Sequence, residues 1–421
     1  MDKYVIAGRK RLEGVIRVSG AKNSTLPILT ACILGRGCCV LEDVPRIQDV
    51  LVMAEVLEHL GCSVTWEGNR VRVDNTGLKL TEISESLMRK MRASNLVLGP
   101  LLGIFGQAKI ASPGGCAIGS RPMDQHIKGL QLMGVEIKEK SGFIMAKASK
   151  LRGADIHLDV PSVGATENLM MAAVLAEGTT LIRNAAREPE LVDLQNFLNG
   201  LGAKVRGAGL DIIRIDGVRQ LSETTHTIIP DRIEAGTHMV AAAITQGDVE
   251  IQNIIPEHME SISAKLREAG VEVTLGEDSV RVRATGRPSA VDIRTLPYPG
   301  FPTDMQPQMM ALMALTEGTS VISESIFENR YKHVDELRRM GVRVRVEGRV
   351  AVVKGVEALD GAFVEATDLR AGASLVLAGL AAEDATIIEN IVHIDRGYEN
   401  LDVKYRELGA KITRISHGGV R

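Results

Sequence analysis

Lys265-Leu-Arg-Glu-Ala-Gly-Val-Glu-Val273 leads from the end of an amphipathic helical stretch, through a glycine, into an alternating strand. The same pattern recurs along the chain, with its glycines 68 to 73 residues apart. They are Gly61, Gly134, Gly202, Gly270, Gly341 and Gly409. A pattern that returns at a nearly constant period indicates one structural unit used repeatedly. The sequence therefore predicts six units of similar structure.

A second recurring piece lies 23 to 28 residues before each of these glycines. It is an apolar helix that ends in a turn and a strand, as in Leu175-Ala-Glu-Gly-Thr-Thr-Leu-Ile182. Because this helix is apolar on all sides, we expect it to be buried, whereas the amphipathic helix should cover a flank. The pattern predicts an α/β fold with three units per domain, with helices inside and short sheets around them.

Composition excludes several classes of protein. A chain of 421 residues is long enough for two or three domains. The 50 basic residues nearly balance the 53 acidic ones, and aromatic residues make up only 3%, which argues against a nucleic-acid partner. The first residues, Met1-Asp-Lys-Tyr-Val5, do not resemble a secretory leader, and no apolar run of about 18 residues predicts a membrane span. We expect a cytoplasmic enzyme.

The segment Ser112–His126 combines a thiol with two potential cations and three glycines. Its prolines and glycines disfavour both a helix and a central strand, so a loop is predicted. Arg121 and His126 are near enough in sequence to lower the pKa of Cys116 if the loop folds over them. The alternative is a surface turn with an incidental cysteine. We expect the other four cysteines to be buried as small hydrophobic residues.

Nine short motifs follow one another along the chain. They are Ser19-Gly-Ala-Lys-Asn23, Lys90-Met-Arg-Ala-Ser94, Pro113-Gly-Gly-Cys-Ala-Ile-Gly-Ser-Arg-Pro122, Ser162-Val-Gly-Ala-Thr166, Ala185-Ala-Arg-Glu-Pro-Glu190, Phe301-Pro-Thr-Asp-Met-Gln306, Phe327-Glu-Asn-Arg330, Ala366-Thr-Asp-Leu-Arg370 and His393-Ile-Asp-Arg-Gly-Tyr398. Each motif alone is a weak signal, whereas nine in order form a specific one. With them the chain resembles the enolpyruvyl transferase family, specifically members that act on UDP-N-acetylglucosamine.

The resemblance implies two inside-out α/β barrel domains, each made of three of the repeated units. The first domain would comprise residues 21–229 and carry the Cys116 loop as a lid. The second would comprise residues 1–20 and 230–421. The active site would lie in the cleft between them, and the lid would shut after the nucleotide sugar binds.

The implied reaction transfers the carboxyvinyl group of phosphoenolpyruvate to the 3-hydroxyl of UDP-N-acetylglucosamine and releases phosphate, the first committed step of peptidoglycan synthesis. Phosphoenolpyruvate is a co-substrate, and the resemblance implies neither a cofactor nor a metal. Because phosphoenolpyruvate is strongly anionic, several cations should converge on it. The resemblance assigns its phosphate to Lys22, Arg121 and Arg396, its carboxylate to Arg330 and Arg370, and a further contact to Asn23. For any single arginine, the alternative is a solvated surface charge.

Addition to an enol requires an acid at the methylene carbon and a base at the sugar hydroxyl. Cys116 resembles the proton donor of the family, which can also add to phosphoenolpyruvate covalently. Asp304 resembles the base, with Lys22 and Arg396 completing the catalytic set. Asp304 could instead be a helix N-cap. Asp368 is a secondary catalytic candidate, and the alternative for it is a structural ion pair.

The nucleotide sugar needs amide donors for its diphosphate and a platform for its base. Ser162, Val163 and Gly164 open an apolar helix whose free amides favour a diphosphate. The resemblance implies the remaining contacts. They are Arg121 and Pro122 stacked on the uracil, Met123, Asp124 and Gln125 lining it, Arg92 on the nucleotide side, and Asn23, Asp304 and Ile326 at the sugar.

Three alternatives remain, one with the same chemistry and two of a different class. The sister enzyme that uses shikimate 3-phosphate would share the buried helices, but it is not expected to carry the Pro-Gly-Gly-Cys loop. A non-catalytic paralogue would bind nucleotide sugar without needing an intact Lys22, Cys116 and Asp304. A purely structural helical repeat would explain neither the loop nor the scattered cations. A cysteine at position 116 also predicts sensitivity to fosfomycin, which alkylates that thiol in the family. The oligomeric state is not encoded in these patterns.

Overall fold

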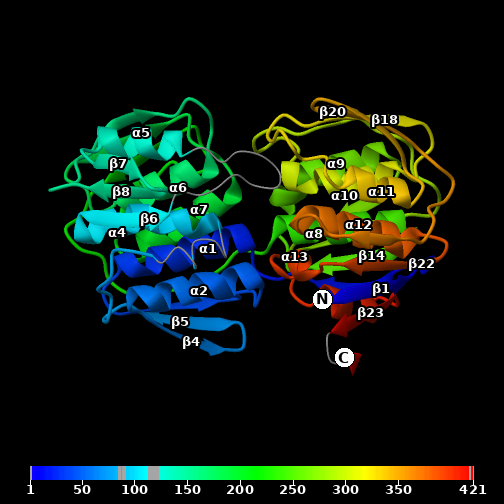
Figure 1. The fold of residues 1–421 in the computed structure, drawn as a ribbon, viewed down its shortest axis with the longest axis horizontal. Coiled ribbons are helices and arrows are strands. Elements are labelled where there is room, and N and C mark those ends of the chain that lie inside the picture. The colour runs from blue at the N-terminus through cyan, green and yellow to red at the C-terminus, as the bar shows by residue number, and fades with distance from the viewer. Residues whose placement is uncertain (1, 84–86, 88–91, 112–122, 417–418, 421) are drawn as a thin grey trace. The chain divides into compact units, whose positions relative to one another are not determined.

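The computed structural model describes residues 2–83, 87, 92–111, 123–416 and 419–420 (Figure 1). Within these residues the chain divides into two compact units. The N-terminal unit comprises the residues from Gly20 to Ile229. The C-terminal unit comprises those up to Ser19 together with those from Pro230 onward. Each unit has its own hydrophobic core.

The N-terminal unit contains three successive helix-and-strand repeats. The first has α1 (Lys22–Ala31), η1 (Cys32–Leu34), β3 (Cys38–Glu42), α2 (Gln48–Leu60), β4 (Ser63–Glu67) and β5 (Arg70–Asp74). The second has η2 (Arg92–Val97), α4 (Leu98–Phe105), β6 (Gln107–Ala111), α5 (Asp124–Leu132), β7 (Glu136–Lys140) and β8 (Phe143–Lys147). The third has β9 (Asp155–His157), α6 (Val163–Ala173), β10 (Thr179–Arg183), α7 (Pro189–Gly200), β11 (Lys204–Arg206), β12 (Ile212–Asp216) and β13 (Thr225–Thr227).

The C-terminal unit repeats the scheme, with two strands supplied by the start of the chain. The first strand, β1 (Lys3–Ala7), joins the sheet of the third repeat. The first repeat has β2 (Glu13–Arg17), α8 (Arg232–Ile244), β14 (Asp248–Gln252), η3 (Pro256–Met259), α9 (Glu260–Glu268), β15 (Glu272–Leu275) and β16 (Ser279–Arg283). The second has β17 (Ile293–Arg294), η4 (Thr303–Met305), α10 (Gln306–Met313), β18 (Thr319–Ser323), α11 (Val334–Arg339), β19 (Arg343–Glu347) and β20 (Val350–Lys354). The third has β21 (Phe363–Glu365), α12 (Leu369–Ala381), β22 (Ala385–Glu389), α13 (Val392–Asp395), α14 (Leu401–Glu407), β23 (Lys411–Ser416) and β24 (Gly419–Val420).

The described strands form six short sheets, three in each unit. In a typical sheet, β17 runs parallel to β18 across the crossover helix α10, and β18, β20 and β19 continue as an antiparallel meander. The start of the chain contributes to two sheets of the C-terminal unit, since β2 pairs with β14 and β1 pairs with both β22 and β23. Among the described strands the sheets remain separate and do not close into one barrel.

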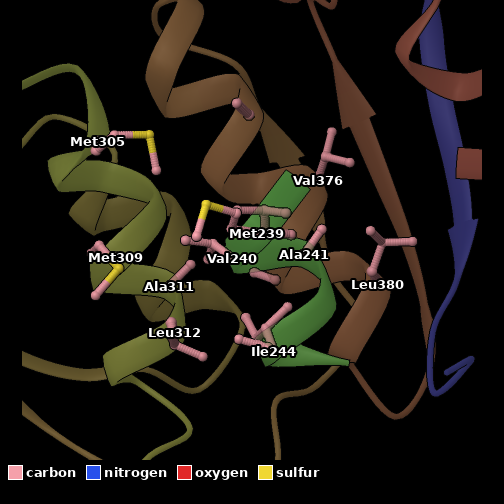
Figure 2. Close-up of a cluster of buried hydrophobic side chains, with 14 of the residues drawn as sticks. Met239, Val240, Ala241, Ile244, Met305, Met309, Ala311, Leu312, Val376 and Leu380 are labelled. Atoms are coloured by element: carbon pink, nitrogen blue, oxygen red, sulfur yellow. The ribbon is translucent and has the colours of Figure 1, made fainter. Parts of the chain in front are cut away.

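The apolar helices lie inside each unit. In the C-terminal unit α8, α10 and α12 pack against one another, and all eight residues of α10 are buried. Figure 2 shows side chains of these helices in one buried cluster, among them Met239 and Ile244 of α8, Leu312 of α10 and Val376 of α12. Fully burying a side chain of this size contributes about 1.5–3 kcal/mol. The predicted α/β fold with internal helices and surrounding short sheets is confirmed.

Backbone geometry explains the glycine signal that marks the repeats. All six glycines have positive φ angles, between 84° and 108°. Gly61, for example, is the left-handed C-cap of α2. A residue with a β-carbon is strained in this conformation, so glycine is favoured where the flank helix turns into its strand.

Two further expectations concern cysteines and membranes. Cys32, Cys39 and Cys62 are free and buried as expected, whereas Cys38 is only half-buried. Among the described helices, none is both long and apolar enough to cross a bilayer.

Candidate active site

Asp304 lies in the turn η4 and is held by two arginines of the C-terminal unit. Arg330 Nη2 donates to Asp304 Oδ1 at 2.9 Å, and Arg370 Nη2 donates to Asp304 Oδ2 at 3.0 Å. The arginine side chains are only 2% and 3% exposed, whereas that of Asp304 is 27% exposed. The structure therefore brings together three residues predicted from separate motifs, and Asp304 is the most exposed of the three.

The N-cap alternative for Asp304 is not realised in α10. The N-cap residue of that helix is Met305, and no side chain caps it. The carboxylate instead compensates buried positive charge. Burial alone would lower the pKa of Arg370, but the nearby Asp304 carboxylate, followed by Tyr398 and Asp231, raises this pKa above its ordinary value.

A buried polar network supports the backbone of Asp304. Gln308 Nε2 donates to the Asp304 carbonyl oxygen at 2.9 Å and to the hydroxyl oxygens of Thr237 and Tyr398 at 3.2 and 3.3 Å. The hydroxyls of Thr237 and Tyr398 are 2.9 Å apart. The guanidinium of Arg370 lies 5.5 Å from the ring centre of Tyr398. Helices α8, α10 and α12 thus fix both Asp304 and one of its arginines.

Asp368 is the N-cap of α12. Its Oδ1 accepts from the amides of Arg370 and Ala371 at 2.9 and 3.0 Å. Capping of α12 therefore accounts for an aspartate at position 368 without either of the predicted roles, a catalytic group or an ion-pair partner. Close to it lies His333, which is fully buried and whose ring nitrogens have no hydrogen-bond partner among the described residues. Burial, with a smaller contribution from Arg330, lowers the pKa of His333 to about 4 although Asp368 opposes the shift.

Arg396 is half-buried at the end of α13. The residue before it, Asp395, receives two hydrogen bonds from the guanidinium of Arg414, at 2.7 and 2.9 Å. Arg414 also donates to Asp2 at 3.0 Å. Both ends of the chain therefore hold the turn that carries Arg396, a role for Arg414 that the sequence did not indicate.

Glu324 is a second residue missed from the sequence. It follows β18 and is 2% exposed. Its carboxylate accepts from Thr303, the neighbour of Asp304, and from the amide of Ile326. A polar residue at the end of a strand is a common pattern, so its position alone did not distinguish it from a surface glutamate.

In the N-terminal unit, Lys22 and Asn23 occupy the first turn of α1. Lys22 Nζ lies 3.6 Å from Asp49 Oδ2, and both side chains are largely buried, at 12% and 5% exposed. The next residue, Ser24, donates to Asp193 Oδ2. Asp193 also bonds His226 Nε2 at 2.8 Å. These bonds hold the start of α1 against α7 and β13.

The predicted diphosphate site lies at the N-terminus of α6, and α5 packs against this helix. Ser162 is the N-cap, accepting from the Ala165 amide at 3.3 Å. His126 packs against Gly164, where a β-carbon would lie 3.3 Å from Nε2 of the imidazole. Burial lowers the pKa of His126 to about 4, although Asp124 acts in the opposite direction.

Gln125 has an internal role. Its amide nitrogen donates to Asp159 Oδ2 at 3.0 Å, and its oxygen accepts from the Asp159 amide at 2.8 Å. Met123 is buried and Asp124 is exposed at the start of the same helix, α5. Gln125 therefore fastens α5 to the segment that leads into α6.

Four predicted residues are not fully described. Cys116, Arg121 and Pro122 lie outside the described residues, and Arg92 is described only as part of η2. The predicted apposition of Cys116 and Asp304 therefore stays a prediction.

Comparison with known proteins identifies the family. A family model described as EPSP synthase (3-phosphoshikimate 1-carboxyvinyltransferase) matches residues 6–404. UDP-N-acetylglucosamine 1-carboxyvinyltransferase 1 from Carboxydothermus hydrogenoformans is 60% identical over 416 residues, covering 99% of each chain. The chain belongs to the enolpyruvyl transferase family. The resemblance stated from the nine motifs is therefore confirmed.

Other enolpyruvyl transferases agree in sequence and fold. UDP-N-acetylglucosamine 1-carboxyvinyltransferase 1 from Symbiobacterium thermophilum is 56% identical over 422 residues, covering 98% of this chain and 95% of the relative. The crystal structure of the enolpyruvyl transferase NikO from Streptomyces tendae matches with a TM-score of 0.89 at 26% identity. That match covers 100% of this chain and 99% of the other. The protein is thus a transferase with the enolpyruvyl transferase fold.

Proposed function

We propose that this enolpyruvyl transferase moves the carboxyvinyl group of phosphoenolpyruvate to the 3-hydroxyl of UDP-N-acetylglucosamine and releases phosphate. The observation that carries the proposal is the 60% identity, over nearly the full chain, to a relative named for this reaction. The family model is named instead for the 3-phosphoshikimate reaction. The sequence favours the nucleotide sugar because Cys116 lies in an intact Pro-Gly-Gly-Cys loop.

The reaction proceeds by addition and then elimination. The 3-hydroxyl oxygen bonds to C2 of phosphoenolpyruvate, its proton passes to a base, and C3 gains a proton from an acid. C3 then loses a proton, the bond from C2 to the phosphate oxygen breaks, and phosphate leaves. We assign the base to Asp304 and the acid to Cys116, with Lys22 and Arg396 stabilising charge on the phosphate.

The two arginines on Asp304 support this assignment. A base that remains paired with two guanidinium groups is a weak proton acceptor. The carboxylate of phosphoenolpyruvate offers these same donors an equivalent partner, and guanidinium groups bind carboxylates in two-pronged geometry. Binding of phosphoenolpyruvate to Arg330 and Arg370 would therefore free Asp304 to accept the proton of the sugar hydroxyl. We assign no catalytic role to Asp368. By capping α12 and accepting from the Arg370 amide, it helps to hold Arg370 at the start of that helix.

The other proposed contacts concern the nucleotide sugar. The first amides of α6, at Val163 and Gly164, suit a diphosphate because a helix N-terminus attracts negative charge. Met123, Asp124 and Gln125 are placed at the uracil with Arg121 and Pro122, and Arg92 is placed on the nucleotide side. Asn23, Asp304 and Ile326 are placed at the sugar, and Asn23 and Arg121 also face phosphoenolpyruvate. Because the side-chain amide of Gln125 is already bonded to Asp159, its role would be to shape the proposed uracil site rather than to bond the base.

The wider role follows from the proposed substrate. This reaction would be the first committed step of peptidoglycan synthesis, carried out in the cytoplasm, where Cys116 remains a reduced thiol. No cofactor beyond the co-substrate phosphoenolpyruvate is proposed.

A phosphate-release assay tests the proposal. The protein is mixed with phosphoenolpyruvate and either UDP-N-acetylglucosamine or shikimate 3-phosphate. We expect release only with the nucleotide sugar. Release only with shikimate 3-phosphate would assign the sister activity. Binding of the nucleotide sugar without release from either mixture would indicate a non-catalytic paralogue.

A further inference from the structure

The carboxylate of Glu324 connects two loops of the C-terminal unit that carry proposed site residues. Its Oε1 accepts from Thr295 Oγ1 and the Ile326 amide, both at 2.9 Å, and from the Phe327 amide at 3.2 Å. Its Oε2 accepts from Thr303 Oγ1 at 2.9 Å. Four donors therefore converge on the carboxylate of a residue that is only 2% exposed.

The two oxygens of Glu324 serve different parts of the site. Oε2 holds Thr303, which precedes Asp304 in η4. Oε1 holds the start of the loop that contains Ile326. Thr295 reinforces this second side, because its hydroxyl oxygen also accepts from the Ser325 amide at 2.9 Å. One side chain thus sets the spacing between the proposed base and the proposed sugar contact.

These loops have little sheet pairing of their own. Segment 295–303 follows the two-residue strand β17, and its recorded pairing is one bridge between Thr295 and Phe301. The loop after β18 begins at Glu324, whose amide donates to the Arg349 carbonyl oxygen at 2.8 Å. Backbone bonds also join these segments, since the Thr295 amide donates to the Ser323 carbonyl oxygen at 3.0 Å. The shared carboxylate adds a link from both of them to Thr303.

Burying a carboxylate is costly unless hydrogen bonds replace its lost hydration. A buried glutamate that served the fold alone could be replaced by an apolar side chain in many proteins. We propose that Glu324 is a positioning residue for the transfer reaction, aligning the Asp304 turn with the Ile326 loop. This inference rests on the proposed function, because it assigns no reaction of its own.

Kinetics of two Glu324 variants test the inference. Misplacing a catalytic group by about 1 Å can cost about 100-fold in rate, so kcat/KM for UDP-N-acetylglucosamine should fall about 100-fold in Glu324→Ala. Glu324→Gln keeps the length of the side chain and an acceptor oxygen, and the Thr303 hydroxyl can accept from its amide. We therefore expect kcat/KM of Glu324→Gln to be about 10-fold higher than that of Glu324→Ala. A purely structural role predicts instead that activity follows thermal stability.

Arg287→Ala is the matched control for lost stability. The Arg287 guanidinium donates to the carbonyl oxygens of Leu315, Thr316 and Val356, beyond the C-terminal end of α10. Asp304 lies before the opposite end of the same helix. Arg287→Ala should lower Tm while leaving kcat/KM within about threefold of the wild-type value. Equal kinetic losses in Arg287→Ala and Glu324→Ala at equal Tm would overturn the inference.

Two threonine variants separate the two sides, and they decide the question even if Glu324→Ala does not fold. Thr303→Val removes only the bond to the base turn and should lower kcat about 10-fold with little change in KM for UDP-N-acetylglucosamine. Thr295→Val loosens the sugar loop and should raise that KM about 10-fold with a smaller change in kcat. Wild-type kinetics in both variants would overturn the inference. An inactive wild-type protein would instead count against the proposed function, so the two failures are distinguishable.

Discussion

Arg370 and Asp304 form a pair in which the cation is buried and the anion is partly exposed. The Arg370 side chain is 3% exposed and the Asp304 side chain 27% exposed, and Nη2 lies 3.0 Å from Oδ2. Pairing of this kind keeps a buried charge compensated while leaving the carboxylate accessible to a ligand. It also makes stability and catalysis depend on the same oxygen atoms.

The first prediction concerns Asp304→Asn. The amide cannot take up a proton, and general-base catalysis is worth about 10²- to 10⁴-fold, so kcat should fall by that range. Two buried guanidinium groups would also lose their anion, which should lower the free energy of unfolding by about 2 kcal/mol. Phosphate release and urea unfolding measure the two effects.

Asp335→Asn provides the control for this variant. Asp335 pairs with Arg338 at 2.8 Å, but its side chain is 81% exposed. Exposed pairs contribute about 0–1 kcal/mol to stability, so the free energy of unfolding should fall by no more than about 1 kcal/mol. The value of kcat should stay close to that of the wild type. Full activity in Asp304→Asn would remove the carboxylate from the mechanism.

Much of the fold could be predicted because its signals are local. The glycines that end flank helices, such as Gly270, and the apolar helices that form each core are readable in short windows. The pairing of β1 with β22 and β23 joins the two ends of the chain, and no local pattern encodes it.

The site was predicted as a set of residues but not as a geometry. Arg330 and Arg370 were recognised from motifs, yet their shared contact with Asp304 depends on how α10 and α12 pack. Glu324 was missed because its donors come from residues up to 29 positions away. Asp368 was weighed as a catalytic residue against an ion-pair partner, and its position as the N-cap of α12 depends on where that helix begins.

The second prediction concerns acid stability. Burial alone would raise the pKa of Glu234, but Lys404, followed by His238, lowers it to about 2. Lys404 Nζ and the His238 ring, at 3.2 Å, both bond this carboxylate, and the Ser19 amide donates to it at 3.1 Å. A carboxylate with a lowered folded-state pKa contributes stability that is present above its unfolded pKa, near 4.5.

That stability should be lost as the pH falls from about 4.5 to about 2, and it amounts to about 3 kcal/mol. Urea unfolding measured across this range checks it, with Glu234→Gln as the comparison, since its stability should vary less with pH. The pKa values of His126 and His333 are about 4 in the folded protein and near 6.5 in the unfolded chain. Their effect on stability therefore changes mainly between pH 6.5 and 4, above the range in which Glu234 acts. Parallel pH curves for the wild type and Glu234→Gln would contradict the prediction.

The third prediction concerns the thiol at position 116. If Cys116 supplies the proton to C3, Cys116→Ser should lower turnover about 10²- to 10⁴-fold, because a hydroxyl is a much weaker acid than a thiol. UDP-N-acetylglucosamine binding, measured by calorimetry, should remain nearly unchanged. Fosfomycin should inactivate the wild type by alkylating Cys116.

Cys38→Ser is the matched control, since Cys38 is a half-buried free thiol on β3. It should retain both wild-type turnover and fosfomycin sensitivity. Inactivation of the Cys116→Ser variant by fosfomycin at the wild-type rate would place the reactive group elsewhere.

The fourth prediction concerns Arg414, which acts on Arg396 through Asp395. Replacing Arg414 by methionine removes both bonds to Asp395 and both bonds to Asp2, while the side chain keeps most of its packing volume. The turn that presents Arg396 should then lose its fixed orientation, because a planar two-pronged pair sets direction as well as distance.

If Arg396 binds the phosphate of phosphoenolpyruvate, Arg414→Met should raise KM for phosphoenolpyruvate about 10-fold and change KM for UDP-N-acetylglucosamine less than about twofold. Steady-state kinetics with each substrate varied in turn measure this difference. Arg406→Met is the control, because Arg406 bonds Asp402 within α14 at 3.1 Å and is 40% exposed. Equal increases in both KM values for Arg414→Met would mean that the ion pair supports the whole unit rather than the phosphate-binding turn.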